Sequence, residues 1–298
     1  MKILITGATG LIGSKLCQFL IHKHSLIALT RSPVKAASVL PPGTHFITSL
    51  DEVDFNDIDA VINLAGEPIA DGRWTRQRKQ EIRDSRINIT RAISSAISAA
   101  TTPPALLISG SAVGVYGRQP SDVTIKEDFT AHYDEFSHQL CRDWEDAALA
   151  AKSEQTRVCI LRTGIVLSKT GGALVKMLPP FRLGLGGPIG KGEQVMSWIH
   201  IDDMVQAILF ILKHDEIEGI VNATAPNPVS NKLLSQELAK TLSRPCIFTV
   251  PPIVLKLVYG EMSDLLLFGQ RVVPQKLLDT GYRFRHDSID EALRSLNL

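Results

Sequence analysis

The sequence contains few cysteines, and no two of them are close together. Cys17, Cys141, Cys159 and Cys246 are far apart, and none belongs to a CxxC motif. Zinc clips and small disulfide scaffolds need closely spaced cysteines, so neither is indicated and we expect no metal site. The same pattern favours a reducing compartment, which we take to be the cytoplasm.

An excess of charge of one sign is also absent. The 298 residues include 32 Lys and Arg and 31 Asp and Glu, which leaves a formal net charge of +1. This balance provides no overall field that would attract nucleic acid or an anionic membrane. We therefore expect neither of them as a partner.

Long hydrophobic runs are missing as well. The most apolar C-terminal stretch, residues 251–259, is interrupted by prolines and Lys256 and stays well below the ~18 residues that a membrane span requires. At the N-terminus, Ile3–Ile5 follows directly, without the basic region and longer apolar stretch of a signal peptide. The sequence predicts a soluble protein.

What the sequence does contain is an alternation of short apolar runs with helical patterns. The runs are apolar throughout, as in strands of a parallel sheet that is covered on both faces. They span residues 3–6, 26–30, 45–48, 60–64, 105–109 and 157–162. Helical spacing marks residues 12–20 and 201–212, and a long polar helix is expected over residues 77–100. The pattern predicts an α/β fold with a doubly wound parallel sheet.

A glycine-rich turn follows the first strand and opens the first helix. It has the pattern GxxGxxG and consists of Gly7, Gly10 and Gly13 with Thr9, Leu11 and Ile12 between them. Such glycines allow a tight turn and a close approach to a pyrophosphate, and the helix N-terminus favours the anion. A glycine triad alone is a weak signal. Its position between a strand and a helix predicts a Rossmann-type dinucleotide-binding domain.

The end of the second strand indicates which dinucleotide is bound. NAD enzymes have an acidic residue there for the ribose hydroxyls, whereas this chain has Thr30, Arg31 and Ser32. A guanidinium can form a charge-assisted fork with a 2′-phosphate, which a carboxylate would repel. We predict NADP(H) as the cofactor, with Thr30 and Arg31 at its adenosine end. The alternative for Arg31 is a solvated charge at the end of a strand.

Composition divides the chain into three expected parts. Residues 1–175, with contributions from 195–225, form the nucleotide-binding domain, residues 176–246 the substrate cleft, and residues 247–298 a C-terminal cap subdomain. The glycines and prolines of residues 179–192 disfavour regular secondary structure. We interpret this stretch as a mobile loop beside a site, or as a plain connector.

Four motifs occur together in this chain: the glycine turn, Asn63–Gly66, Ser109–Ala112 and Trp198–Asp203. Together they resemble the extended short-chain dehydrogenase/reductase superfamily of sugar-nucleotide epimerases, dehydratases and reductases. Four longer motifs are Asn63–Pro68, Met177–Gly190, Gly269–Pro274 and Gly281–Tyr282. These are similar to the atypical epimerase-family branch often labelled nucleoside-diphosphate-sugar epimerase, with a small C-terminal domain of unknown function. The resemblance covers nearly the whole chain.

The resemblance implies a cofactor groove with particular lining residues. Leu64, Ala65 and Gly66 would lie on its adenosine and ribose side. Ser109 would end the neighbouring strand, and Val166 would belong to the strand and loop that pass the nicotinamide.

Two polar positions also follow from the resemblance. Ser111 would stand where the superfamily has its catalytic hydroxyl. Arg86 falls where these enzymes usually have an asparagine, so its charge could reach the cofactor. Alternatively, Arg86 is an exposed helix residue that pairs with Glu81 or Asp84.

The chain departs from the superfamily pattern in the catalytic residues. Members that transfer hydride use a YxxxK pattern, in which tyrosine moves a proton and lysine lowers the tyrosine pKa from ~10 toward neutrality. This sequence has no YxxxK. The tyrosine position falls on Phe136 or Ser137, and the lysine position on Leu140 or Cys141.

Other proton donors remain open at this point. Tyr116 or Tyr133 could donate a hydrogen bond, and His138 or His200 could act as acid or base. Water could also supply the proton, with Ser111 as the donor to an oxyanion. Finally, the protein could bind NADP(H) and catalyse nothing.

Two polar runs have simpler interpretations. His200 precedes Asp202 and Asp203 at a helix start, where acidic residues suit the helix dipole, so we first interpret this trio as a cap. The basic residues 73–79 are interpreted as a solvated helix start or as the outer end of the cofactor groove.

The sequence therefore predicts an NADP(H)-binding oxidoreductase or epimerase-like enzyme. Its substrate is expected to be small and polar, with nucleotide-linked sugars among the candidates, and it can form an oligomer. The alternative is a catalytically inactive protein that senses the NADP(H) ratio.

Overall fold

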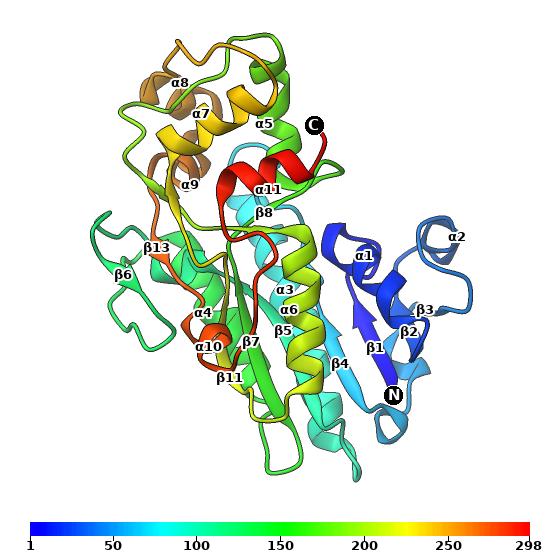
Figure 1. Ribbon diagram of the computed structural model, residues 1–298. Helices are drawn as coiled ribbons and strands as arrows, with labels where there is room; N and C mark the ends of the chain where they lie inside the picture. The colour runs from blue at the N-terminus through cyan, green and yellow to red at the C-terminus, as the bar shows by residue number, and fades with distance from the viewer.

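A computed structural model describes residues 1–298. Its centre is a seven-stranded parallel sheet with the strand order β11-β7-β5-β4-β1-β2-β3 (Figure 1). The strands are β1 (Lys2–Thr6), β2 (Ser25–Leu29), β3 (His45–Ile47), β4 (Ala60–Asn63), β5 (Leu106–Ala112), β7 (Arg157–Thr163) and β11 (Gly219–Ala223). The predicted doubly wound α/β fold is confirmed, and all six expected strands are present.

The strand β11 is an addition to the prediction. It is short, begins at the positive-φ residue Gly219 and contains the polar Asn222, so its sequence lacks a continuous apolar run. Asn222 is nevertheless buried, because its side chain accepts a hydrogen bond from Tyr116 and donates one to the carbonyl of Val273. Its polarity is satisfied by tertiary partners that the local sequence does not reveal.

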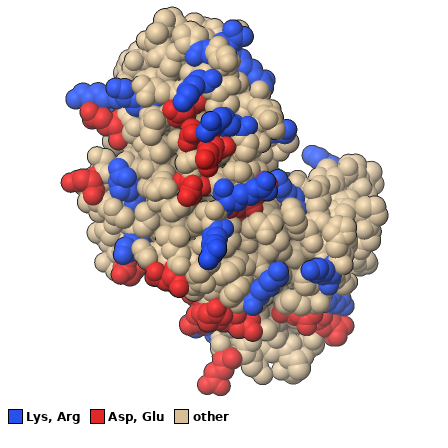
Figure 2. Space-filling model, viewed as in Figure 1, with Lys and Arg blue, Asp and Glu red and all other residues tan.

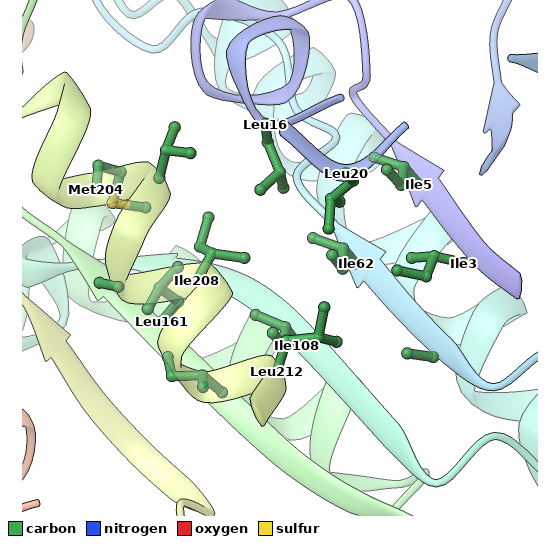
Figure 3. Packing of buried hydrophobic residues seen from close by; sticks show 14 of the residues in the cluster. Ile3, Ile5, Leu16, Leu20, Ile62, Ile108, Leu161, Met204, Ile208 and Leu212 are labelled. Atoms are coloured by element: carbon green, nitrogen blue, oxygen red, sulfur yellow. The ribbon is translucent and has the colours of Figure 1, made fainter. Parts of the chain in front are cut away.

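One face of the sheet is covered by α1 (Leu11–Leu20) and α6 (Ile201–Lys213). Alternate residues of the strands, such as Ile3 and Ile5, point to this face and pack against Leu16 and Ile208 (Figure 3). Each fully buried side chain of this size contributes roughly 1.5–3 kcal/mol relative to exposure. This packing fixes α1, and with it the glycine turn, against the sheet.

The opposite face is covered by α3 (Arg76–Ala99) and α4 (Phe136–Leu149). Leu4 and Val61 point to this side and share a core with Ile93 and Ile97. The helix α3 begins at the cap Thr75, whose side chain accepts from the Arg78 N–H, and it ends shortly before Pro103 and Pro104. Proline cannot continue a helix, so this end agrees with the prediction.

A second, smaller lobe lies at the carboxyl ends of the strands (Figure 1). Its helices are α5 (Gly172–Arg182), α7 (Asn231–Thr241), α8 (Pro252–Tyr259), α9 (Asp264–Leu267) and α11 (Ile289–Ser295). Trp198, Phe181 and Leu234 belong to its separate core. The division of the chain at residues 175 and 246 remains our proposal.

Short elements complete the fold. They are α2 (Pro33–Ala37), α10 (Gln275–Asp279), β6 (Thr124–Ile125), β8 (Ile165–Leu167), β9 (Val195–Met196), β10 (Trp198–His200), β12 (Val229–Ser230) and β13 (Arg271–Val272). The glycine-rich stretch expected over residues 179–192 starts inside α5 and is irregular after Arg182. None of the helices combines the length and the apolarity needed to span a bilayer.

Candidate functional site

The segments predicted to bind the cofactor meet at the point where the order of the strands in the sheet reverses. From the neighbours β1 and β4, the strand order runs outward to β2 and β3 on one side and to β5, β7 and β11 on the other. Ligands of open α/β sheets bind in the crevice at such a switch point. The turn Gly7–Gly13 follows β1, and Leu64–Gly66 follows β4, so both border this crevice.

Two glycines of the turn are required by the packing of the backbone. Gly7 has a φ of +67°, and a Cβ there would overlap the carbonyl of Leu64. A Cβ on Gly13 would overlap the carbonyl oxygen of Gly7. These contacts bring the turn, α1 and the loop after β4 together as close neighbours.

Gly10 is different, because a Cβ there would meet only one atom of the protein. Its φ of −75° and ψ of 176° suit any residue. A Cβ would meet only the Gly7 oxygen, at 3.1 Å, and no other atom within 4 Å. Gly10 is also the N-cap of α1, and no side chain caps that end. The unpaired N–H groups and this open space fit a closely approaching anion such as a diphosphate.

The other residues of the turn have distinct surroundings. Leu11 extends to the start of α5, where a Cβ on Gly171 would lie 3.2 Å from its side chain. Ile12 and Val166 are half-buried against the same core cluster, and Thr9 is exposed. The structure therefore brings the turn and the predicted nicotinamide-side strand β8 to the same region.

The predicted adenosine end is exposed. Arg31 has 94% of its side chain accessible, and its Nη1 lies 3.1 Å from Glu67 Oε1. The Thr30 hydroxyl accepts from the N–H of Ser32 at 3.2 Å, and Ser32 caps α2. An exposed ion pair is worth only ~0–1 kcal/mol, so Arg31 can leave Glu67 for a phosphate at little cost.

Arg86 points inward and supports the loop after β4. Its Nη2 donates to the Glu67 carbonyl at 2.8 Å, and its Nη1 donates to the Ile82 carbonyl at 2.9 Å. The guanidinium lies over the Trp144 ring, and a Cβ on Gly66 would lie 2.9 Å from it. Burial lowers the pKa of Arg86. The expected alternative, an exposed residue paired with an acid of α3, is wrong because this side chain packs beneath residues 66–67.

Ser109 is fully buried within the sheet layer. Its hydroxyl accepts a hydrogen bond from Asn63 Nδ2 at 3.3 Å, and the same amide donates to Thr90 at 2.8 Å. The Thr6 hydroxyl donates to Asn63 Oδ1 at 2.6 Å. Ser109 was expected to end its strand, but β5 continues to Ala112, so its hydroxyl lies within the strand. The network joins the carboxyl ends of β1 and β4 to the middle of β5 beneath the crevice.

Ser111 donates its hydrogen bond to a buried carboxylate. Its Oγ lies 2.6 Å from Glu145 Oε1. Arg162 forms a fork with the same carboxylate, at 2.9 Å from Nε to Oε1 and 2.7 Å from Nη2 to Oε2. Both charged side chains are only 8% exposed. Burial by itself would lower the pKa of Arg162, but the hydrogen bonds that Arg162 forms with Glu145 raise it.

Tyr116 lies beside this cluster. The Arg162 guanidinium lies over its ring at 4.8 Å from the centroid. Its hydroxyl donates to Asn222 Oδ1 at 2.8 Å, and burial raises the pKa of Tyr116. The structure thus brings Ser111 and Tyr116 to one arginine, with both hydroxyl protons already held by protein acceptors.

The positions of the missing YxxxK pattern hold other groups. Ser137 is buried and donates to Glu135 Oε1 at 2.7 Å. Cys141 is buried as well, and burial raises the pKa of its thiol to about 12. The His138 ring stacks on His132, with centroids 4.1 Å apart. None of these side chains adds a cation beside a tyrosine hydroxyl.

Sequence reasoning did not identify Glu145 as the partner of Ser111. A signal was available, because Glu145 lies on the buried side of α4 and Arg162 lies in the apolar strand β7. Charges in such positions must find partners, since an unpaired buried charge is very costly. The pairing itself depends on the distance between a helix and a strand, which spacing does not give.

The predicted cap at the start of α6 is confirmed. The His200 Nδ1 accepts the N–H of Asp202 at 3.1 Å. One side-chain nitrogen or oxygen atom from each of His200, Asp202 and His286, of the kind that can bind a metal ion, lies within 4.8 Å of the other two. The Asp202 carboxylate already pairs with the ammonium of Lys15 from α1. This cluster therefore links α6 to the helix that carries the glycine turn.

Acid is expected to destabilise the protein through His200. Burial, with a smaller contribution from His286, lowers its pKa from 6.5 to about 4. Between pH 6.5 and about pH 4 the unfolded chain binds more protons than the folded chain, so the free energy of unfolding decreases as the pH is lowered, by up to about 3 kcal/mol. We expect His200→Asn, which keeps a cap acceptor, to flatten the change in melting temperature between pH 7 and pH 4. An unchanged pH slope would contradict this role.

Comparison with protein families gives two matches. Residues 3–223 match the NAD dependent epimerase/dehydratase family, and residues 250–296 match a domain of unknown function, DUF1731. The chain is 38% identical over 307 residues to the epimerase family protein SDR39U1 homolog, chloroplastic, of Arabidopsis thaliana, covering 99% of this chain and 86% of that protein.

Two solved structures are also similar. Human epimerase family protein SDR39U1 (isoform 2) with NADPH matches with a TM-score of 0.91 and 33% identity, covering 100% of this chain and 99% of that chain. The nucleoside-diphosphate sugar epimerase from Corynebacterium glutamicum matches with a TM-score of 0.77 and 31% identity, covering 100% of this chain and 58% of that chain.

Proposed function

Since this chain belongs to the NAD dependent epimerase/dehydratase family, we propose that it binds NADP(H) and acts as an oxidoreductase or epimerase-like enzyme on a small polar substrate. The observation that carries the proposal is the open, uncapped start of α1 at Gly10, at the switch point of the sheet. The human relative that was crystallised with NADPH supports it. We further propose a cytoplasmic location and no nucleic-acid partner.

The chain offers a position for each part of the cofactor. The backbone of residues 10–12 would hold the diphosphate, and Arg31 with Thr30 would hold the 2′-phosphate. Leu64–Gly66 would lie against the adenosine and ribose, and Val166 near the nicotinamide. When bound, the nicotinamide supplies or accepts a hydride.

The proposed chemistry depends on where a proton comes from. Ser111 and Tyr116 could donate to a substrate oxygen only after giving up hydrogen bonds to Glu145 and Asn222. A buried hydrogen bond to a charged acceptor is worth ~1.5–3 kcal/mol, which opposes that transfer for Ser111. In an enzyme with this arrangement, water is therefore the better proton source.

The same observation favours a second candidate function. A protein that senses the NADP(H) ratio needs the coenzyme site but no proton donor. The engaged hydroxyls of Ser111 and Tyr116 and the absence of YxxxK are compatible with such a sensor.

Turnover distinguishes the two candidates. NADPH oxidation would be measured with small aldehydes and ketones, and conversion of UDP-sugars to their epimers would be followed by product analysis. Each assay would use the wild-type protein, Ser111→Ala and Tyr116→Phe. An enzyme is expected to turn over at least one substrate. A rate that persists in both variants fits water as the proton source, whereas a lost rate assigns the proton to one of the two hydroxyls; NADPH binding should persist in either case. Coenzyme binding without turnover of any substrate in the panel would favour the sensor and contradict the oxidoreductase.

Coenzyme preference tests Arg31. We expect Arg31→Ala to weaken NADPH binding by about 10- to 100-fold, because a charge-assisted contact worth ~1.5–3 kcal/mol is lost, and to leave NADH binding unchanged. Titration followed by NADPH fluorescence measures both affinities. Arg91→Ala, an exposed arginine of α3, is the matched control. Equal loss for both coenzymes would contradict recognition of the 2′-phosphate.

A further inference from the structure

The helix α8 is apolar and yet not buried. Its sequence is PIVLKLVY, and none of its residues falls in the buried class. Leu257 is 69% exposed and Ile253 is 61% exposed. A helix that is apolar around most of its circumference is normally covered by a core or by lipid. This helix therefore lacks its covering surface in the isolated chain.

Two neighbouring loops extend the exposed surface. Leu183 is 75% and Ile247 is 76% exposed. The loops are side by side, because Val250 N–H donates to the Pro188 carbonyl at 2.9 Å and Gly190 N–H donates to the Val250 carbonyl at 2.9 Å. We call this surface the apolar end; it consists of Leu183, Leu185, Ile247, Phe248, Ile253, Val254, Leu257 and Val258. Contiguous apolar patches of this kind mark interaction sites.

The helix α8 is held at its C-terminal end, where Tyr259 packs against a small buried cluster that includes Trp74 and Met262. Arg73 Nη2 donates to the Leu257 carbonyl at 2.6 Å, and its Nε donates to the Val258 carbonyl at 3.1 Å. Lys79, from the same basic run, pairs with Glu261 just beyond α8. The basic run thus satisfies the C-terminal carbonyls of α8 and fixes the helix with its apolar side chains outward.

The segments that carry the apolar end are rich in basic residues, two of which pair with acids: Lys176 with Asp71, and Lys240 with Glu237. Residues 176–194 and 227–260 contain seven basic residues, Lys176, Arg182, Lys191, Lys232, Lys240, Arg244 and Lys256, against two acidic ones, Glu193 and Glu237. The remainder of the chain therefore has an excess of acid. Figure 2 shows this end of the molecule, at the top, as mostly tan with blue side chains, while the red ones lie lower. The net charge of +1 does not reveal this uneven distribution of basic and acidic residues.

We propose that the apolar end docks on the surface of a negatively charged lipid bilayer. Apolar side chains would enter the boundary between headgroups and acyl chains, ~5–10 Å deep, with Lys and Arg at the level of the headgroups. A second copy fits less well, because a two-fold interface would place this basic surface against itself. The expectation of no membrane partner rested on net charge, which does not report on the distribution of charge.

Vesicle binding tests the proposal. The full chain would be sedimented with vesicles of phosphatidylcholine alone and with vesicles that also contain phosphatidylglycerol. We expect binding to the anionic vesicles only, weakened by salt, and reduced by about tenfold or more in Leu257→Glu and in Lys256→Glu. Because these side chains are exposed, the melting temperature and NADPH binding should not change.

Matched substitutions at the other end of the molecule are the controls. Val34→Glu and Lys23→Glu change exposed residues outside the lobe and should bind vesicles like the wild-type protein. Absence of binding to anionic vesicles would overturn the proposal, as would equal loss in the control variants. So would light scattering that shows a dimer which Leu257→Glu dissociates, because that result would assign the apolar end to a second copy.

Discussion

Gly10→Val is expected to weaken NADPH binding by about 100-fold or more and to leave the fold intact. The Cβ of the new side chain would meet a single atom, the carbonyl oxygen of Gly7 at 3.1 Å, so a shift of a few tenths of an ångström is enough to accommodate it. It would instead occupy the space that a diphosphate needs at the start of α1 and prevent close approach of the backbone. Titration calorimetry with NADPH measures the binding loss, and thermal unfolding checks the fold.

Neighbouring substitutions make this result interpretable. Gly10→Ala should bind NADPH with an intermediate affinity, because its side chain is smaller. Gly13→Val should fail to fold, since its Cβ overlaps the carbonyl of Gly7 whether or not a cofactor is present. Wild-type NADPH affinity in a folded Gly10→Val protein would contradict the placement of the diphosphate.

Glu145→Ala is expected to destabilise the protein by about 3–5 kcal/mol, because it leaves the Arg162 guanidinium buried without its partner. Urea unfolding followed by circular dichroism gives the change in the free energy of unfolding. The same substitution releases the Ser111 proton from its acceptor. If enough folded protein remains, turnover can be compared with that of the wild-type chain.

A double replacement distinguishes the effect of an unpaired buried charge on stability from the effect of losing side-chain volume. Glu145→Met combined with Arg162→Met should cost much less than Glu145→Ala, because no buried charge is left unpaired. Glu218→Ala removes an exposed partner of Lys152 and should change stability by roughly 0.5 kcal/mol or less. A double variant that is less stable than the single one would contradict this explanation.

The fold could be predicted because its signals are local. Continuous apolar runs such as Ala60–Ile62 identify strands that are buried on both faces, and prolines after residue 100 end the long helix. The strand β11 was missed because Asn222 is compatible with burial only through its contacts with Tyr116 and Val273.

For the candidate site as well, only the features that depend on local sequence could be predicted. The glycine turn carries its own geometric requirement, so spacing alone placed it correctly after β1. The orientation of Arg86, beneath Gly66, and the partner of Ser111 depend on how α3 and α4 pack against the sheet. Such contacts join residues far apart in the chain, and single-residue patterns do not determine them.

Calorimetric titration of the unmodified protein with NADPH and, separately, with NADH tests the coenzyme site most directly. We expect saturable binding of one NADPH per chain, tighter than that of NADH. If neither coenzyme produced a binding signal at saturating concentration, the glycine turn would not be a dinucleotide site in this protein, and the proposed function would be wrong.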